Sequence, residues 1–275
     1  MALDHTLIGV DGPAHERTWT AKDTMLYALG VGAGTSELEF ATEKGQRVLP
    51  TFAVLAAQAP PGRRLGDFDP AMLVHAEQSF ELHRELPPAG GVRTTSRVTG
   101  IYDKGSGALV TLSATAVDLR TEEPVITSRS AVFIRGEGGF GGDRGPRNRW
   151  TVPDRAPDHK VTYATRPEQA LIYRLSGDYN PLHSDPEFAA RAGFDRPILH
   201  GLCTYGVTGR ALLHAVAGSN PGRLRGMSGR FTSPVFPGES LTVSVWEEGV
   251  EVLFRTSKDD GTVVLDHGRA TILHP

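Results

Sequence analysis

Hydrophobic and polar positions follow a helical period in one long segment of the chain and alternate in several shorter ones. Through 199–218, leucines, aromatic residues and glycines recur at helical spacing, and Gly218 is a natural helix stop. Strand-like runs follow at 240–248, 250–257 and 262–273, and similar runs of the first half occupy 91–104, 108–119 and 124–135. A long helix that antiparallel strands must wrap predicts an α+β fold.

Two shorter helices are expected ahead of the long one. The first covers "RPEQALIYRLSGD", with Thr165 as its cap and Pro167 in its first turn. The second is "PEFAARAG", which should end at Gly193.

The two halves of the chain resemble each other. Aligning "TMLYALGVG" with "ALIYRLSGD" places Tyr27 opposite Tyr173, and aligning "VLPTFAV" with "ILHGLCT" places Pro50 opposite His200. Matches in the same order indicate a duplicated unit, with the same order of elements in each half. Two such units in tandem would pair edge to edge and cover strand edges that otherwise invite aggregation.

A segment rich in glycine and arginine, "RGEGGFGGDRGPRNRW", separates the halves. It has almost no apolar periodicity, which is typical of an exposed linker. We therefore expect a first unit over 1–135, a linker over 136–150 and a second unit over 151–275.

Composition limits the partners and the cellular compartment that the protein is expected to have. The chain has 275 residues, is 39% hydrophobic and carries a formal net charge of −3, which gives no electrostatic case for a nucleic-acid partner. Its single cysteine, Cys203, excludes an internal disulfide and fits a reducing compartment. Neither a secretory signal nor an apolar run long enough to cross a membrane is visible, so we expect a cytoplasmic protein without a membrane partner.

The stretch "SGDYNPLHSD" concentrates polar chemistry on a kinked segment. Asp178, Asn180 and His183 follow one another closely, and Pro181 bends the chain between them. A carboxylate and an imidazole so placed would hold one water between them, with the carboxylate orienting or deprotonating it and the imidazole passing protons. The amide of Asn180 would fix the carboxylate or the water. The same residues would also suit a purely structural loop.

The longer string "YRLSGDYNPLHSDPEFAARAGFDRPILHGLCTYG" resembles the hydratase 2 motif of the MaoC-like dehydratase family, the (R)-specific enoyl-CoA hydratases. "GRFTSPVFPGESL" is similar to that family's second conserved stretch, and the two-unit length resembles its double hot-dog members. The resemblance implies a double hot-dog fold and a catalytic role for Asp178, Asn180 and His183. It also implies that the Gly201 N–H, at the start of the long helix, binds the thioester oxyanion.

Further roles follow from the same resemblance. Phe231 matches a position that touches acyl-CoA, although a core aromatic is an equal interpretation. "LVHAEQ" and "YDKGSG" resemble substrate-contacting stretches of the eukaryotic relatives, so His75, Ala76 and Lys104 are expected to contact CoA. A strand-edge histidine and an exposed turn lysine are equal interpretations. His200 lies in the motif but is more easily read as structural.

The first half departs from the motif. Gly32 stands opposite Asp178, and Pro50 and Thr51 stand opposite His200 and Gly201, so one active site per chain is expected.

The expected activity is hydration of trans-2-enoyl-CoA to the (3R)-hydroxyacyl-CoA, without a redox or metal cofactor. Three alternatives remain open at this point: a 3-hydroxyacyl-thioester dehydratase of fatty-acid synthesis, a hot-dog thioesterase, and a noncatalytic acyl-CoA binding protein. No HExxH, CxxC, P-loop or GxSxG sequence supports another chemistry. The sequence leaves open a homodimer or a monomer.

Overall fold

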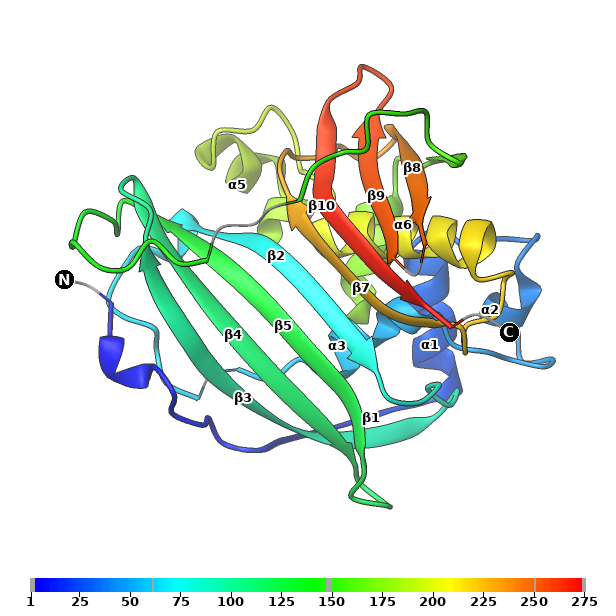
Figure 1. The fold of residues 1–275 in the computed structure, drawn as a ribbon, viewed down its shortest axis with the longest axis horizontal. Helices are drawn as coiled ribbons and strands as arrows, with labels where there is room; N and C mark the ends of the chain where they lie inside the picture. Colours follow the sequence, from blue (N-terminus) through cyan, green and yellow to red (C-terminus); the bar gives the residue numbers. More distant parts are fainter. Residues whose placement is uncertain (1–2, 61, 147–149, 250, 274–275) are drawn as a thin grey trace.

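The computed structural model describes residues 3–60, 62–146, 150–249 and 251–273. The ten strands that it describes form one antiparallel sheet, which curves around the helices (Figure 1). The strands of the first half are β1 (His15–Trp19), β2 (Leu73–Leu82), β3 (Gly90–Asp103), β4 (Gly107–Asp118) and β5 (Pro124–Arg135). Those of the second half are β6 (His159–Ala164), β7 (Leu224–Phe231), β8 (Ser240–Glu248), β9 (Glu251–Lys258) and β10 (Val263–Ile272).

The order of the strands shows the duplication directly. It runs β1-β3-β4-β5-β2-β7-β10-β9-β8-β6, so each half has the same internal order and the two halves meet at β2 and β7. At this junction Phe80 lies opposite Met227 in an antiparallel pairing. The expected edge-to-edge contact is thus present, and it joins the two five-stranded units into a single sheet.

The sequence pattern found six of these strands and missed four. The missed strands are β1, β2, β6 and β7, of which β2 and β7 form the junction. β7 ("LRGMSGRF") contains two glycines and two arginines, so its alternation of apolar and polar residues is weak. The formation of β7 therefore depends on the strands that it pairs with, β2 and β10, more than on its own residues.

The long helix forms as expected, as α6 (Gly201–Val216), packed against β6, β7, β8 and β10. Ahead of it lie α4 (Gln169–Tyr173), the 3₁₀ turns η4 (Arg174–Ser176) and η5 (Pro181–His183), and α5 (Pro186–Arg191). α4 begins four residues later than the proposed cap, because the Thr165 hydroxyl donates to the Glu239 carbonyl (2.7 Å) instead of capping a helix.

The first half differs from the second in its helices. It has η1 (His5–Leu7), α1 (Ala21–Gly30), α2 (Leu38–Ala41), η2 (Pro50–Phe52), α3 (Ala53–Ala56) and η3 (Pro70–Met72). Where the second half has the 16-residue α6, the first has only η2 and the four-residue α3. The expectation of the same elements in both halves therefore holds for the strands but is wrong for the central helix.

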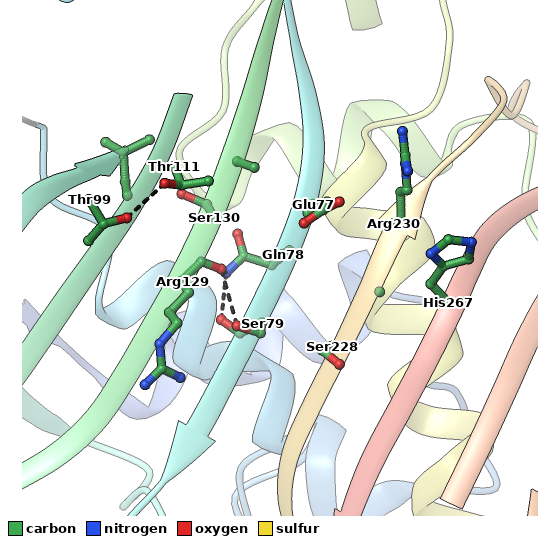
Figure 2. A pocket seen from close by; sticks show the side chains of 13 residues that line it. Glu77, Gln78, Ser79, Thr99, Thr111, Arg129, Ser130, Ser228, Arg230 and His267 are labelled. Atoms are coloured by element: carbon green, nitrogen blue, oxygen red, sulfur yellow. Dashed lines mark hydrogen bonds between the residues drawn. The ribbon is translucent and has the colours of Figure 1, made fainter. Parts of the chain in front are cut away.

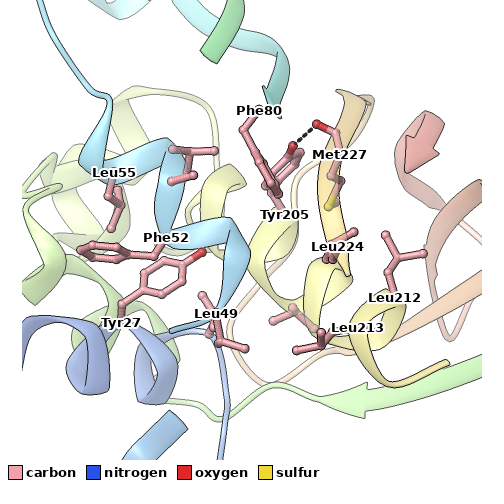
Figure 3. Packing of buried hydrophobic residues seen from close by; sticks show 14 of the residues in the cluster. Tyr27, Leu49, Phe52, Leu55, Phe80, Tyr205, Leu212, Leu213, Leu224 and Met227 are labelled. Carbon is pink, nitrogen blue, oxygen red and sulfur yellow. Dashed lines mark hydrogen bonds between the residues drawn. The ribbon is translucent and has the colours of Figure 1, made fainter. Parts of the chain in front are cut away.

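One hydrophobic cluster spans both halves (Figure 3). Tyr27 from α1, Phe52 from η2 and Tyr205 from α6 are all buried, and the Tyr205 hydroxyl donates to the Met227 carbonyl of β7 at 2.6 Å. A Cβ at Gly206 of α6 would collide with Val31, so this glycine lets the helix approach the first half closely. The two units share a core as well as a sheet.

A buried ionic cluster also joins the halves. Arg210 of α6 and Glu37, which precedes α2, are 4% and 5% exposed, and Arg210 Nε donates to Glu37 Oε1 at 3.1 Å. His214 Nε2 lies 2.7 Å from the same oxygen, and Arg210 also donates to the Val31 carbonyl at 2.9 Å. Burial alone would raise the pKa of Glu37, but hydrogen bonds from His214 and Arg210 outweigh it and lower the pKa to about 2.

In the described ranges no helix is long and apolar enough to span a membrane.

Candidate active site

The loop between η4 and η5 holds itself in shape through its own polar groups. Gly177 takes a left-handed conformation with φ of 119°, which favours glycine and turns the chain out of η4. The backbone N–H of Asn180 donates to Asp178 Oδ1 at 3.2 Å, and the Asn180 side chain accepts from Leu182 N–H at 3.0 Å. Asn180 thus caps η5 and is exposed, so its side chain shapes the loop that carries Asp178 and His183.

His183 is buried, and its tautomer follows from its surroundings. Its Nδ1 lies 2.9 Å from the carbonyl of Ile198, which can only accept, so Nδ1 carries the proton. The neutral ring therefore presents an unprotonated Nε2. Burial lowers the pKa of His183 below its ordinary value, which keeps the ring unprotonated and able to accept a proton at neutral pH.

His200 contacts the loop through the main chain of Asp178. It precedes α6, is 1% exposed, and its Nε2 donates to the Asp178 carbonyl at 3.2 Å. Its ring stacks on that of His183, with centroids 3.7 Å apart and planes at 28°, and Tyr173 packs against it at 4.8 Å. Burial and the neighbouring His183 lower the pKa of His200 to about 4. These contacts favour the structural interpretation of His200.

Asp178, His183 and His200 form one polar cluster. A ligand atom from each lies within 4.8 Å of the others. A bridging water reaches partners up to about 5 Å apart, so one water can contact two of these atoms at once. A metal ion would have to lie about 2 Å from both imidazoles and in the plane of each ring. Two stacked rings with nearly parallel planes do not meet that condition.

The start of α6 faces Phe231. A Cβ built on Gly201 would lie 3.4 Å from the Phe231 ring, an ordinary van der Waals distance. The backbone therefore does not require glycine here, in contrast to Gly206. N–H groups in the first turn of a helix lack intrahelical acceptors and attract negative charge. The space beside Gly201 is thus suited to an anionic atom of a ligand.

A cavity of about 880 Å³ opens next to this cluster. Its walls include all four residues expected to contact substrate, namely His75, Ala76, Lys104 and Phe231. They come from different elements: His75 and Ala76 from β2, Lys104 from the turn after β3, and Phe231 from the end of β7. Ala76 is the extra residue of a β-bulge between His75 and Glu77.

His75 and Phe231 connect the cavity with the polar cluster. Their rings lie 5.0 Å apart, and Phe231 faces Gly201. His75 Nε2 donates to the Glu77 carbonyl at 3.0 Å, and burial lowers the pKa of this histidine to about 4 although the Asp178 carboxylate opposes the shift. The sequence identified these residues, but it missed Tyr102 and Pro146 as walls of the same cavity.

A smaller hollow of about 260 Å³ adjoins the cavity and shares four residues with it, including Glu77 and Arg230 (Figure 2). Arg230 and His267 lie near each other on β7 and β10, whereas Arg129 points away at the opposite end. The two arginines do not converge on one point, so this hollow has no clear binding chemistry of its own.

The first half fills the corresponding place with packing groups. Thr51, opposite Gly201 in the alignment, is 1% exposed and lies where a Cβ on Gly209 would collide with it. A Cβ on Gly32, opposite Asp178, would lie 3.0 Å from Arg210 Nη1. Here the first half contacts α6 and offers no counterpart to the polar cluster.

The chain matches two family models. The MaoC like domain covers residues 149–268, and the MFE-2 hydratase 2 N-terminal domain covers residues 18–136. Among curated relatives, 3-hydroxyacyl-thioester dehydratase Y of Mycobacterium tuberculosis is 46% identical over 98% of both chains. Enoyl-CoA hydratase ChsH3 of the same organism is 44% identical over 88% of both chains.

Solved structures agree with this relationship. A MaoC-like dehydratase from Phytophthora capsici is 35% identical, has a TM-score of 0.88 and covers 98% of each chain. A Mycobacterium tuberculosis protein described as a double hotdog fold is only 15% identical, has a TM-score of 0.58 and covers 96% of each chain, and so shows the fold alone. The expected double hot-dog fold and the family resemblance are confirmed: the chain belongs to the MaoC-like dehydratase and hydratase 2 family, a family of hydro-lyases.

Proposed function

We propose that this protein is an (R)-specific enoyl-CoA hydratase, which adds water to a trans-2-enoyl-CoA and gives the (3R)-hydroxyacyl-CoA. The observation that carries the proposal is the position of Asp178 and His183: a side-chain ligand atom of one lies within 4.8 Å of a ligand atom of the other, beside His200, which precedes α6. Supporting it, a relative named as an enoyl-CoA hydratase is 44% identical to the chain.

In the proposed reaction, Asp178 and His183 hold one water between them. His183 Nε2 accepts a proton from this water as its oxygen forms a bond to C3 of the substrate. The π electrons of the C2–C3 bond move onto the thioester, and C2 then takes up the proton that His183 received. Asp178 orients the water and stabilises the transient imidazolium. Each proton transfer of this kind typically contributes on the order of 10²–10⁴-fold to the rate.

Negative charge develops on the thioester oxygen during the addition. The Gly201 N–H would donate to this oxygen, and removal of such a donor in other enzymes costs about 3 kcal/mol. His75, Ala76, Lys104 and Phe231 would hold the CoA portion in the adjoining cavity. Lys104 is the natural partner for a phosphate there.

The same site can catalyse the reverse reaction, because hydration is reversible. The relative named as a 3-hydroxyacyl-thioester dehydratase is 46% identical, which favours dehydration as the second candidate function. The two roles differ in the carrier of the acyl group: the hydratase would act on CoA thioesters, and the dehydratase of fatty-acid synthesis would act on carrier-protein thioesters. We propose a cytoplasmic location, in which the buried thiol of Cys203 would stay reduced.

The first test follows the loss of enoyl absorbance when the purified protein meets crotonyl-CoA and a longer trans-2-enoyl-CoA, with chiral analysis of the product. Asp178→Asn and His183→Gln are measured alongside, because both substitutions change charge or basicity with little change of volume. The proposal predicts (3R) product from the wild type and loss of at least about 10³-fold in kcat from each variant.

Other outcomes point elsewhere. Release of free CoA without hydration would identify a thioesterase. Tight binding of the thioester with neither reaction would identify a binding protein. Comparing crotonyl-CoA with the same acyl group on a carrier protein then decides between the two hydro-lyase roles.

A further inference from the structure

The carboxylate of Asp103 organises the segment between the two halves. Asp103 ends β3 and is 7% exposed, and its oxygens accept the N–H of Gly105 (2.8 Å), Gly139 (2.8 Å) and Gly141 (2.7 Å). These donors, Gly139 foremost, lower the pKa of Asp103. One side chain therefore fastens a distant glycine-rich segment to the β3–β4 turn.

The glycines of segment 136–146 fit this contact closely. A Cβ on Gly138 would lie 2.5 Å from the Gly105 carbonyl oxygen. A Cβ on Gly145, which has a φ of 76°, would lie 2.8 Å from the Tyr102 ring. The Asp103 N–H in turn donates to the Asp143 carbonyl at 2.8 Å. The segment is largely exposed, as expected, but it is fixed in place along its described part; residues 147–149 of the linker lie outside the described residues.

This attachment forms one side of the large cavity. Tyr102 and Lys104, which flank Asp103, line the cavity together with Pro146 from the attached segment. Lys104 Nζ donates to the carbonyl of Arg144, so the same segment holds the ammonium group in position. That single hydrogen bond leaves two ammonium protons for a ligand.

We propose that Asp103 is a positioning residue for thioester recognition, which holds segment 136–146 so that Lys104 and Pro146 form the binding wall for the phosphate-bearing part of the thioester. The inference rests on the proposed function for its substrate and deepens it. The described hydrogen bonds of Asp103 go to Gly105, Gly139, Gly141 and Asp143 and to none of the cluster residues, so we expect it to affect substrate binding and not the chemical step.

Replacement of the carboxylate by an amide tests this arrangement with minimal change of shape. A carboxylate offers acceptors on both oxygens, whereas an amide would turn two N–H donors toward Gly139 or Gly141. Asp103→Asn should therefore release the segment. Asp118→Asn is the matched control, because Asp118 Oδ1 accepts from the N–H groups of Arg120 (2.8 Å) and Thr121 (2.9 Å) at the other end of β4.

The kinetic experiment compares a 2-enoyl-CoA with the corresponding N-acetylcysteamine thioester, which lacks every phosphate. For Asp103→Asn we expect KM for the CoA substrate to rise at least about 10-fold, kcat to stay within about 3-fold, and kcat/KM for the truncated thioester to stay unchanged. The Asp118→Asn variant should match the wild type on both substrates. An equal loss on both thioesters would overturn the inference, because the role would then be general to the fold.

Two measurements that need no catalysis separate this inference from the proposed function. Hydrogen exchange should show lost protection at Gly139 and Gly141 in Asp103→Asn, and calorimetry with CoA itself should show affinity weakened by at least about 10-fold. If the wild type binds CoA in an Asp103-dependent way but hydrates nothing, the positioning role stands and the hydratase proposal fails. Unchanged CoA affinity after release of the segment would refute the positioning role.

Discussion

The rings of His183 and His200 stack with centroids 3.7 Å apart and an interplanar angle of 28°. His200 also donates from Nε2 to the Asp178 carbonyl at 3.2 Å. One side chain therefore contacts both residues of the proposed acid–base pair, His183 through its ring face and Asp178 through its main chain. Its Nδ1 is buried and has no hydrogen-bond partner among the described residues. We therefore expect His200 to position the proposed pair rather than to exchange protons itself.

Replacing His200 with Phe should affect the position of the Asp178 loop, and so the activity, much more than the stability of the fold. Phenylalanine keeps a flat ring against His183 but loses the donor to Asp178, so we expect kcat to fall by about 10-fold or more through misplacement of the loop. The substitution also removes a buried, unpartnered nitrogen, so the free energy of unfolding should fall by less than about 1 kcal/mol. Steady-state kinetics and urea unfolding check both values. Full activity in His200→Phe would contradict the role assigned to the hydrogen bond.

The pH dependence of hydration should reflect the lowered pKa of His183. The neutral ring is the active base, and protonation removes it. Because burial lowers this pKa, the acidic limb of kcat/KM should lie below about pH 6.5, the ordinary value for histidine. A profile of kcat/KM against pH measures the pKa of this acidic limb directly. A pKa above about 6.5 would contradict the assignment of His183 as the base.

Acid should also destabilise the fold. Burial and the stacked His183 lower the pKa of His200 to about 4, and burial lowers that of His75 to about 4, whereas unfolded histidine titrates near 6.5. Between these values the unfolded chain binds more protons than the folded one, so the free energy of unfolding decreases as pH falls from about 6.5 to about 4. Urea unfolding at several pH values should show this slope, and His200→Phe should reduce it.

Gly201→Ala should impair catalysis without unfolding the protein. The added methyl group would contact Phe231 at an ordinary distance of 3.4 Å, but it would occupy the space beside the Gly201 N–H. We expect kcat/KM to fall by about 10²–10³-fold, as for loss of an oxyanion donor, and stability to stay the same or rise slightly.

Gly206→Ala is the matched control for this variant. Its Cβ would collide with Val31, so it should lower the free energy of unfolding by about 1–3 kcal/mol. If Gly201→Ala were instead destabilised and Gly206→Ala were not, Gly201 would be the packing glycine and its proposed role would be wrong.

The buried cluster of Glu37, Arg210 and His214 should matter for stability. Glu37→Gln leaves Arg210 buried without a counter-charge, so we expect a loss of about 3–5 kcal/mol in the free energy of unfolding. In the wild type this contribution should be full above the ordinary glutamate pKa of 4.5 and disappear as pH falls toward about 2.

The exposed pair of Arg97 and Asp11 provides the comparison. Its charges are 49% and 53% exposed, so Asp11→Asn should unfold within error of the wild type. Equal effects of the Glu37 and Asp11 variants would show that the buried ionic cluster stabilises the fold no more than an exposed ion pair does.

The sequence by itself determined the elements whose pattern is local. Helical spacing marked α6, alternation marked six strands, and the spacing of Asp178, Asn180 and His183 marked the polar loop. These features depend on residues close together in the chain, and the resemblance to a known family extended them to His75, Ala76, Lys104 and Phe231.

Only the tertiary structure decided how distant segments meet. β2 and β7, which the sequence pattern missed, pair with each other across the junction of the two halves as well as with a strand of their own half. In place of a long helix the first half has only η2 and α3, and Thr51 of η2 fills the space beside Gly209 of α6. The stacking of His183 on His200 and the attachment of segment 136–146 to Asp103 join residues far apart in sequence, and such contacts depend on three-dimensional packing that no local periodicity encodes.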